Sequence, residues 1–147
     1  MRVGLIGAGT VTKTFGRHLI NAGHEIVVSN SRGPETLTGL AAELGPRATA
    51  GTKTQAAESD VVILATNWAT VPEALKNIDW HGRILIDATN AHMAPKPDIS
   101  RDGVNKSLIS LDGRNSSEMI AEMAVGARLV KLDQQYAYGV DTRLFTK

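Results

Sequence analysis

The chain has 147 residues and a formal net charge of +1, with 42% hydrophobic and 4% aromatic residues. This length corresponds to one domain with a largely aliphatic core. The nearly balanced charge argues against a nucleic-acid partner, which requires a basic surface. Because the sequence contains no cysteine, disulfides, thiolate catalysis and cysteine-ligated metals are excluded, and the other residue types show no metal-ligand spacing.

The sequence carries neither a membrane span nor an export signal. No apolar run approaches the length that crosses a bilayer, and the first residues lack the pattern of a signal peptide. We therefore expect a cytoplasmic protein without a membrane partner.

Short apolar segments alternate along the chain with segments of helical periodicity. In chain order, the expected elements are a strand at residues 3–6, a helix ended by Gly23, a strand at 25–29, a helix from Pro34 to Gly45, a weak strand at 48–50, a short helix after Thr52, a strand at 60–65, a helix from Thr70 through Leu75, a strand at 83–87, a helix at 116–125 and a strand at 128–132. Capping boxes are expected at three helix starts, formed by Thr52 with Gln55, Thr70 with Glu73, and Asn115 with Glu118. The alternation predicts an α/β fold, a doubly wound parallel sheet of the Rossmann type with about six strands and helices on both faces.

A glycine turn lies between the first strand and the first helix, which is the context in which such a turn indicates a dinucleotide site. Gly7 permits a tight turn, and Gly9 lets the backbone approach a pyrophosphate. The helix start at Thr10 and Val11 offers free N–H groups and a partial positive charge. Thr12 replaces the third glycine of the fingerprint and indicates either a slightly displaced helix or a hydroxyl donor to phosphate. The alternative for the whole segment is a strand–helix turn without a ligand.

The end of the second strand has no acidic residue to hold a ribose 2′-hydroxyl, as an NAD site would have. Asn30, Ser31 and Arg32 follow it instead. A carboxylate would repel a 2′-phosphate, whereas an amide, a hydroxyl and a guanidinium bind one. The sequence therefore predicts that the cofactor is NADP(H), and Arg32 is the strongest indicator. The alternative is that Arg32 is an exposed loop residue ahead of a helix.

Polar residues also follow the fourth and fifth strands, where the rest of a dinucleotide would lie. Thr66, Asn67 and Trp68 follow the fourth strand, and Asn90 follows the fifth. Trp68 either walls the cleft or packs under the next helix, and Asn90 either binds a carboxamide or substrate oxygen or forms an Asx turn. Of the histidines, only His92 lies near this predicted site. Hydride transfer needs no nucleophile–base pair, and no catalytic residue is assigned.

The chain resembles the NADP-binding domain of the deazaflavin-dependent NADP oxidoreductases, which pass hydride between NADPH and coenzyme F420. The matching stretches are residues 4–11, 29–34, 60–68, 86–90 and 116–131. The resemblance implies that Thr10, Val11, Ser31 and Arg32 touch NADP phosphates. It also implies that the ends of the fourth and fifth strands border the nicotinamide.

The chain departs from the family in two places. Thr12 replaces a glycine, and the segment after Lys131 differs from the Ala-Phe-Asn-Thr type of segment that leads to further elements of the acceptor pocket. We assign residues 1–132 to an NADP-binding domain and residues 133–147 to a divergent tail, expected at an oligomer interface. The first hypothesis is an NADPH-dependent oxidoreductase, acting on a small or flavin-like acceptor as a homodimer. The second is a non-catalytic NADP(H)-binding module or sensor, or a truncated relative.

Overall fold

The computed structural model describes residues 1–91 and 111–132, so that His92 and the predicted tail lie outside the described residues. The elements in chain order are β1 (Arg2–Ile6), α1 (Thr10–Asn21), β2 (Glu25–Ser29), η1 (Pro34–Leu37), α2 (Thr38–Leu44), β3 (Ala48–Ala50), α3 (Lys53–Ala57), β4 (Val61–Leu64), η2 (Trp68–Thr70), α4 (Val71–Leu75), β5 (Ile84–Asp87), α6 (Ser116–Met123) and β6 (Arg128–Lys131). The predicted strands are all present, with ends that differ by no more than one residue from those expected. Pro34 begins a 3-10 turn rather than a continuous helix, and the last helix ends at Met123 rather than at residue 125.

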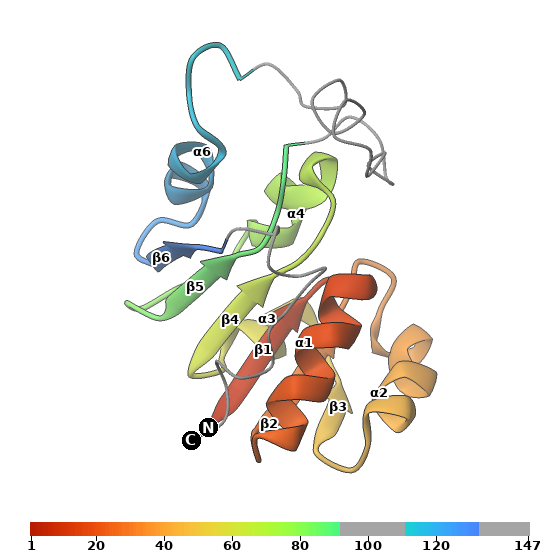
Figure 1. The fold of residues 1–147 in the computed structure, drawn as a ribbon. Helices are drawn as coiled ribbons and strands as arrows, with labels where there is room; N and C mark the ends of the chain where they lie inside the picture. Colours follow the sequence, from red (N-terminus) through yellow and green to blue (C-terminus); the bar gives the residue numbers. More distant parts are fainter. Residues whose placement is uncertain (92–110, 133–147) are drawn as a thin grey trace.

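The strands form one six-stranded sheet in the order β3-β2-β1-β4-β5-β6. Every neighbouring pair is parallel. The predicted doubly wound parallel sheet is therefore confirmed (Figure 1). The chain leaves β1 toward β2 and β3 on one side and later returns to β4 on the other. This reversal lies between β1 and β4, which is where ligands bind at the carboxyl edge of such sheets.

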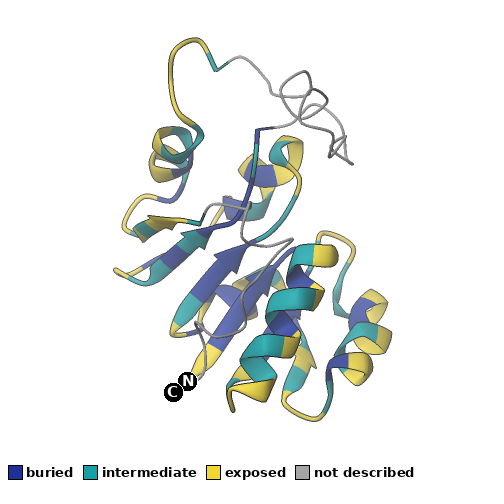
Figure 2. Ribbon diagram, viewed as in Figure 1, coloured by how far each residue is buried: buried dark blue, intermediate teal, exposed yellow. Residues whose placement is uncertain are grey.

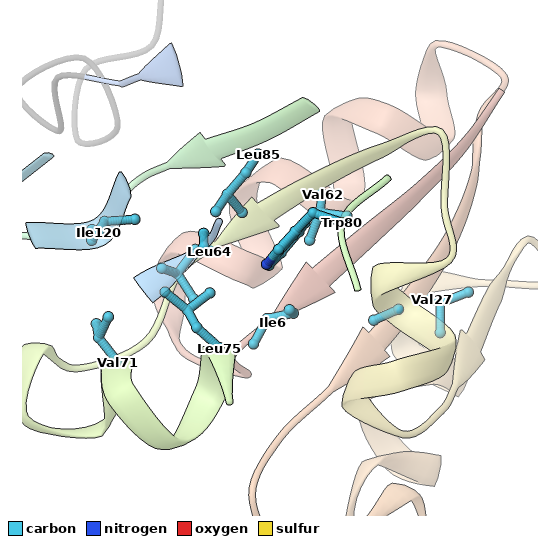
Figure 3. Packing of buried hydrophobic residues seen from close by; sticks show 11 residues of the cluster. Ile6, Val27, Val62, Leu64, Val71, Leu75, Trp80, Leu85 and Ile120 are labelled. Atoms are coloured by element: carbon cyan, nitrogen blue, oxygen red, sulfur yellow. The ribbon is translucent and has the colours of Figure 1, made fainter. Parts of the chain in front are cut away.

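Helices cover the sheet on both faces and divide the core into two clusters. The first cluster packs α1, η1 and α2 against alternate residues of the strands, including Leu5 and Val28. The second packs α3, α4 and α6 against the other face, where Trp80 lies among Ile6, Val62 and Leu64 (Figure 3). Figure 2 shows the central strands buried along most of their length, as a parallel sheet between two helical layers requires.

Two of the three predicted capping boxes are confirmed. Thr52 Oγ1 accepts a hydrogen bond from the N–H of Gln55, and Gln55 Oε1 accepts one from the N–H of Thr52. Asn115 and Glu118 make the same reciprocal pair at the start of α6. Each box uses only residues within one helical turn, which is why the sequence alone predicts it.

The prediction of the third capping box, between Thr70 and Glu73, is wrong. The side chain of Thr70 does not cap α4. Its hydroxyl donates to the carbonyl of Asn67 at 2.8 Å, because η2 already forms a helical turn ahead of α4.

No described helix has the length and hydropathy needed to span a membrane.

Candidate functional site

The glycine turn after β1 packs directly against the neighbouring strand ends. The N–H of Gly7 donates to the carbonyl of Ser29 at the end of β2, over 2.9 Å. Gly7 has a φ of +120°, and a Cβ at this position would lie only 2.1 Å from the carbonyl oxygen of Ala65, just after β4. A side chain is therefore excluded both by conformation and by space. Gly7 thus brings the carboxyl ends of β1, β2 and β4 together.

Gly9, by contrast, faces open space at the start of α1. A Cβ at Gly9 would meet no heavy atom of the described residues within 4 Å. The first hydrogen bond of the helix runs from the N–H of Lys13 to the carbonyl of Gly9 at 3.1 Å. The N–H groups of Thr10 and Val11 come before Lys13, the first helical donor, and therefore have no acceptor within the helix. No acidic residue stands in the first turn, so that the helix start is suited to an anionic group.

Thr12 does not fit the role of a phosphate donor. Its exposed fraction is 0%, and its hydroxyl donates to the carbonyl of Gly7 at 3.0 Å. The expectation that this hydroxyl reaches a phosphate is therefore wrong, because the group is enclosed and already engaged. Thr12 instead fastens the first turn of α1 to the glycine turn.

The loop after β2 is shaped by the side chain of Asn30. Its Oδ1 accepts a hydrogen bond from the N–H of Arg32, and its Nδ2 donates to Thr36 Oγ1, both over 2.9 Å. Thr36 Oγ1 in turn donates to the carbonyl of Gly33 at 2.8 Å. Both ends of the Asn30 amide are thus used inside the loop. Asn30 was predicted to touch the cofactor, but its side chain holds the backbone that presents Ser31 and Arg32.

Ser31 and Arg32 are exposed on this loop. None of the ion pairs between described residues includes Arg32. One acidic side chain lies close by: a Cβ at Gly33 would be 2.3 Å from Glu35 Oε1. The loop therefore offers a hydroxyl and a guanidinium, with a carboxylate at its margin.

The segment after β4 forms a second polar loop at the same edge. Thr66 Oγ1 and Thr70 Oγ1 lie 2.8 Å apart, and Asn67 is exposed between them. Trp68 is half-buried and packs against the core cluster that includes α4 and α6. Of the two interpretations of Trp68, this contact favours packing under the following helix.

The end of β5 contains a cluster that the sequence analysis did not single out. Asp87 is fully buried, and its Oδ1 accepts from the N–H and the hydroxyl of Thr89 at 2.8 and 2.7 Å. Lys131, at the end of β6, donates through Nζ to Asp87 Oδ2 at 2.8 Å and to the carbonyl of Thr89 at 2.6 Å. Half-buried Asn90 follows directly. In the sequence, each of the two is a charged residue at the end of an apolar strand, and both lie in stretches that match the family, residues 86–90 and 116–131.

All of these residues except Thr12 therefore lie at the carboxyl edge of one parallel sheet, at or just after the ends of β1, β2, β4, β5 and β6. Residues 2–91 match the model of a protein family described as "NADP oxidoreductase coenzyme F420-dependent". The chain belongs to this family. The resemblance seen in the sequence is thereby confirmed. A comparison with curated protein sequences gave no match.

Solved structures show the same fold. The hypothetical protein SMa0349 from Sinorhizobium meliloti is 30% identical, with a TM-score of 0.76 over 89% of this chain and 60% of that one. A protein from Arthrobacter sp. FB24, proposed to be an F420-dependent NADP reductase, is 22% identical, with a TM-score of 0.66 over 92% of this chain and 65% of that one. A reductive aminase from Aspergillus terreus, solved with NADPH and ethyl levulinate, is 19% identical, with a TM-score of 0.60 over 88% of this chain and 39% of that one. The chain thus spans less than two thirds of the length of each.

Membership of the F420-dependent NADP oxidoreductase family agrees with the chemistry of the site. The open space over Gly9 and the N–H groups of Thr10 and Val11 fit a pyrophosphate. The hydroxyl and guanidinium after β2 fit a further phosphate. Among the residues that the structure describes, no three His, Asp or Glu side chains gather as metal ligands would.

Proposed function

We propose that the chain is an NADPH-dependent oxidoreductase that passes hydride to or from a small or flavin-like acceptor. The observation that carries this proposal is the exposed guanidinium of Arg32, which has no acidic partner in the ion pairs of the described residues. It stands on a loop that Asn30 shapes, beside the open glycine turn of β1.

In this proposal, each half of NADPH has its own set of residues. Gly9, Thr10 and Val11 hold the pyrophosphate through backbone N–H groups and the helix dipole. Ser31 and Arg32 hold the 2′-phosphate, which distinguishes NADPH from NADH. A guanidinium binds a phosphate through two parallel hydrogen bonds, so that its contribution is lost when the phosphate is absent.

The nicotinamide half extends from the glycine turn in the other direction, over the ends of β4 and β5. Thr66, Asn67 and Asn90 border it there, and they orient the ring and the acceptor. The nicotinamide itself supplies the hydride, so that the protein has to provide proximity and polarity rather than a nucleophile.

Two measurements test the proposal. Calorimetric titration with NADPH and NADH should show binding with a clear preference for NADPH. Steady-state oxidation of NADPH should then be followed with coenzyme F420, a flavin, and a small carbonyl or imine as acceptors. Turnover with one of them is the expected result. Tight NADPH binding without turnover on any acceptor would favour the hypothesis of a non-catalytic module or sensor.

A further inference from the structure

We propose that Lys131 is a positioning residue that acts through Asp87 and Thr89. It fixes the turn after β5 against the nicotinamide half of the bound dinucleotide. This inference rests on the proposed function, because it assumes that NADPH lies along the carboxyl edge of the sheet. It concerns a residue on β6, a strand that carries none of the predicted cofactor contacts.

Hydrogen bonds from Asp87 and Lys131 hold the turn after β5 from two sides. Asp87 and Lys131 are partners in the parallel register of β5 and β6. The Asp87 carboxylate holds the N–H and the hydroxyl of Thr89, and the Lys131 ammonium holds the Thr89 carbonyl. The ammonium and the carboxylate also bind each other at 2.8 Å. Every polar group of Thr89 is therefore engaged, and the direction in which the chain continues to Asn90 is fixed.

Main-chain hydrogen bonds continue the sheet on both sides of Asp87, and on the β6 side the Leu132 N–H donates to the Asp87 carbonyl at 2.8 Å. Leu64 occupies the register position next to Asp87 on β4, and the backbone bond from the Ala88 N–H to its carbonyl continues the ladder there at 3.0 Å. A buried ion pair generally adds little stability compared with apolar residues of similar size. A buried carboxylate paired with a partly exposed ammonium at the end of two strands is therefore better explained by the turn that the two groups hold.

The charge balance makes the turn dependent on Lys131. The Asp87 side chain is 0% exposed, whereas that of Lys131 is 35% exposed. Within residues 1–91 and 111–132, Lys131 is the only cation paired with Asp87. Without the ammonium, the buried carboxylate must draw in water or move toward solvent. Either response displaces Thr89, and with it the start of the segment that carries Asn90.

The position of the turn makes the nicotinamide half the affected part of the cofactor. Arg32 lies after β2, on one side of the glycine turn, and Thr89 lies after β5, on the other side. A dinucleotide that spans the switch point between β1 and β4 places its two halves on these two sides. A displaced Thr89 should therefore weaken contacts with the nicotinamide half and leave the 2′-phosphate contacts unchanged.

The test compares two ligands that share only one half. NADPH carries the nicotinamide, whereas 2′,5′-ADP carries the adenosine, the 2′-phosphate and the 5′-phosphate alone. In Lys131→Met, we expect the Kd for NADPH to rise about tenfold and the Kd for 2′,5′-ADP to change less than about twofold. Binding should be measured by calorimetry well below the Tm of each variant. Lys53→Met is the matched control, because that side chain is 31% exposed and also meets a carboxylate and a backbone carbonyl, from Glu73.

A second variant guards against failure of Lys131→Met to fold. Thr89→Val removes the hydroxyl donor to Asp87 but keeps the ion pair, and it should show the same selective effect with a smaller size. Equal losses for both ligands, or no loss for either, would overturn the positioning role. If wild type binds neither ligand, the proposed function fails and this inference fails with it. If wild type binds both and only the selectivity of Lys131→Met is missing, the proposed function stands and this inference alone is wrong.

Discussion

At the scale of single residues, the preference for NADPH depends on Arg32. Replacing Arg32 with Ala should weaken NADPH binding by about 2 kcal/mol, roughly thirtyfold in Kd, because a charge-assisted pair with the 2′-phosphate is lost. NADH has no 2′-phosphate, so its Kd should hardly change. Calorimetric titration of both proteins with both cofactors measures the difference.

The carboxylate of Glu35 provides a control in which the change in NADPH affinity should have the opposite sign. Glu35 lies beside Gly33 on the same loop, and its charge opposes a bound phosphate. Glu35→Gln should therefore bind NADPH slightly more tightly than wild type. If Glu35→Gln instead weakens NADH binding and leaves NADPH binding unchanged, Glu35 holds a ribose hydroxyl of NADH and its charge does not oppose the bound 2′-phosphate. Equal losses for both cofactors in Arg32→Ala would make Arg32 a structural residue.

The two glycines of the turn should respond differently to the same substitution. In Gly7→Ala, the new Cβ would lie 2.1 Å from the Ala65 carbonyl at a φ of +120°, so that the strand ends must separate. We expect a loss of about 3 kcal/mol or more in the free energy of unfolding. In Gly9→Ala, the Cβ enters open space, so that the Tm should stay near that of wild type.

Cofactor titration completes this comparison. The Cβ of Gly9→Ala occupies the space proposed for the pyrophosphate, so that NADPH binding should weaken although the fold is intact. Thermal unfolding followed by circular dichroism gives the stability, and calorimetry gives the Kd. A stable Gly9→Ala variant that binds NADPH as wild type does would place the pyrophosphate elsewhere.

At the scale of elements, an exposed ion-pair cluster joins α1 to α2. Glu43 on α2 pairs with Lys13 and Arg17 on α1. The nearby charge of Lys13, followed by the hydrogen bond from Arg17, lowers the pKa of Glu43 below its usual value. A carboxyl group with a lowered pKa in the folded state stabilises the protein above its unfolded pKa, and this contribution is lost as the pH falls through the folded value.

The lowered pKa of Glu43 predicts how the stability of the Glu43→Gln variant depends on pH. At neutral pH the variant should have a slightly lower Tm than wild type, and the difference should shrink as the pH falls below about 4. High salt should also reduce it, because the pair is exposed to solvent. A Tm difference that persists unchanged in acid would mean that Glu43 acts through packing. Glu58→Gln is the control, because Glu58 is exposed and takes part in none of the ion pairs between described residues.

At the scale of the whole molecule, we expect a homodimer that uses the side of the sheet around β6. This strand is the last in the sheet order, so that its outer edge has no strand partner among the described residues. Val130 on β6 is 51% exposed, and Val125 just before it is 78% exposed. Size-exclusion chromatography with light scattering should give the mass of two chains, and Val130→Asp should shift it toward one. A wild-type monomer at high protein concentration would contradict this expectation.

The fold class, the strand positions, two helix caps and the family could all be predicted from the sequence. These features depend on local periodicity, on residues within one helical turn, or on short motifs, so that neighbours in the chain suffice to predict them. The glycine turn and the exposed arginine loop were found in the same way. The false capping box at Thr70 shows the limit of local patterns, because the adjoining turn of η2 takes the hydroxyl instead.

The roles of several site residues depend instead on contacts between distant parts of the chain. The Thr12 hydroxyl is buried against Gly7, which the replacement of a glycine by itself did not reveal. Asp87 and Lys131 are 44 residues apart, and only the pairing of β5 with β6 makes them partners. Whether a polar side chain meets a ligand or another part of the protein depends on which strand ends are adjacent. The order of the strands in the sheet determines which strand ends are adjacent, and this order exists only in the folded chain.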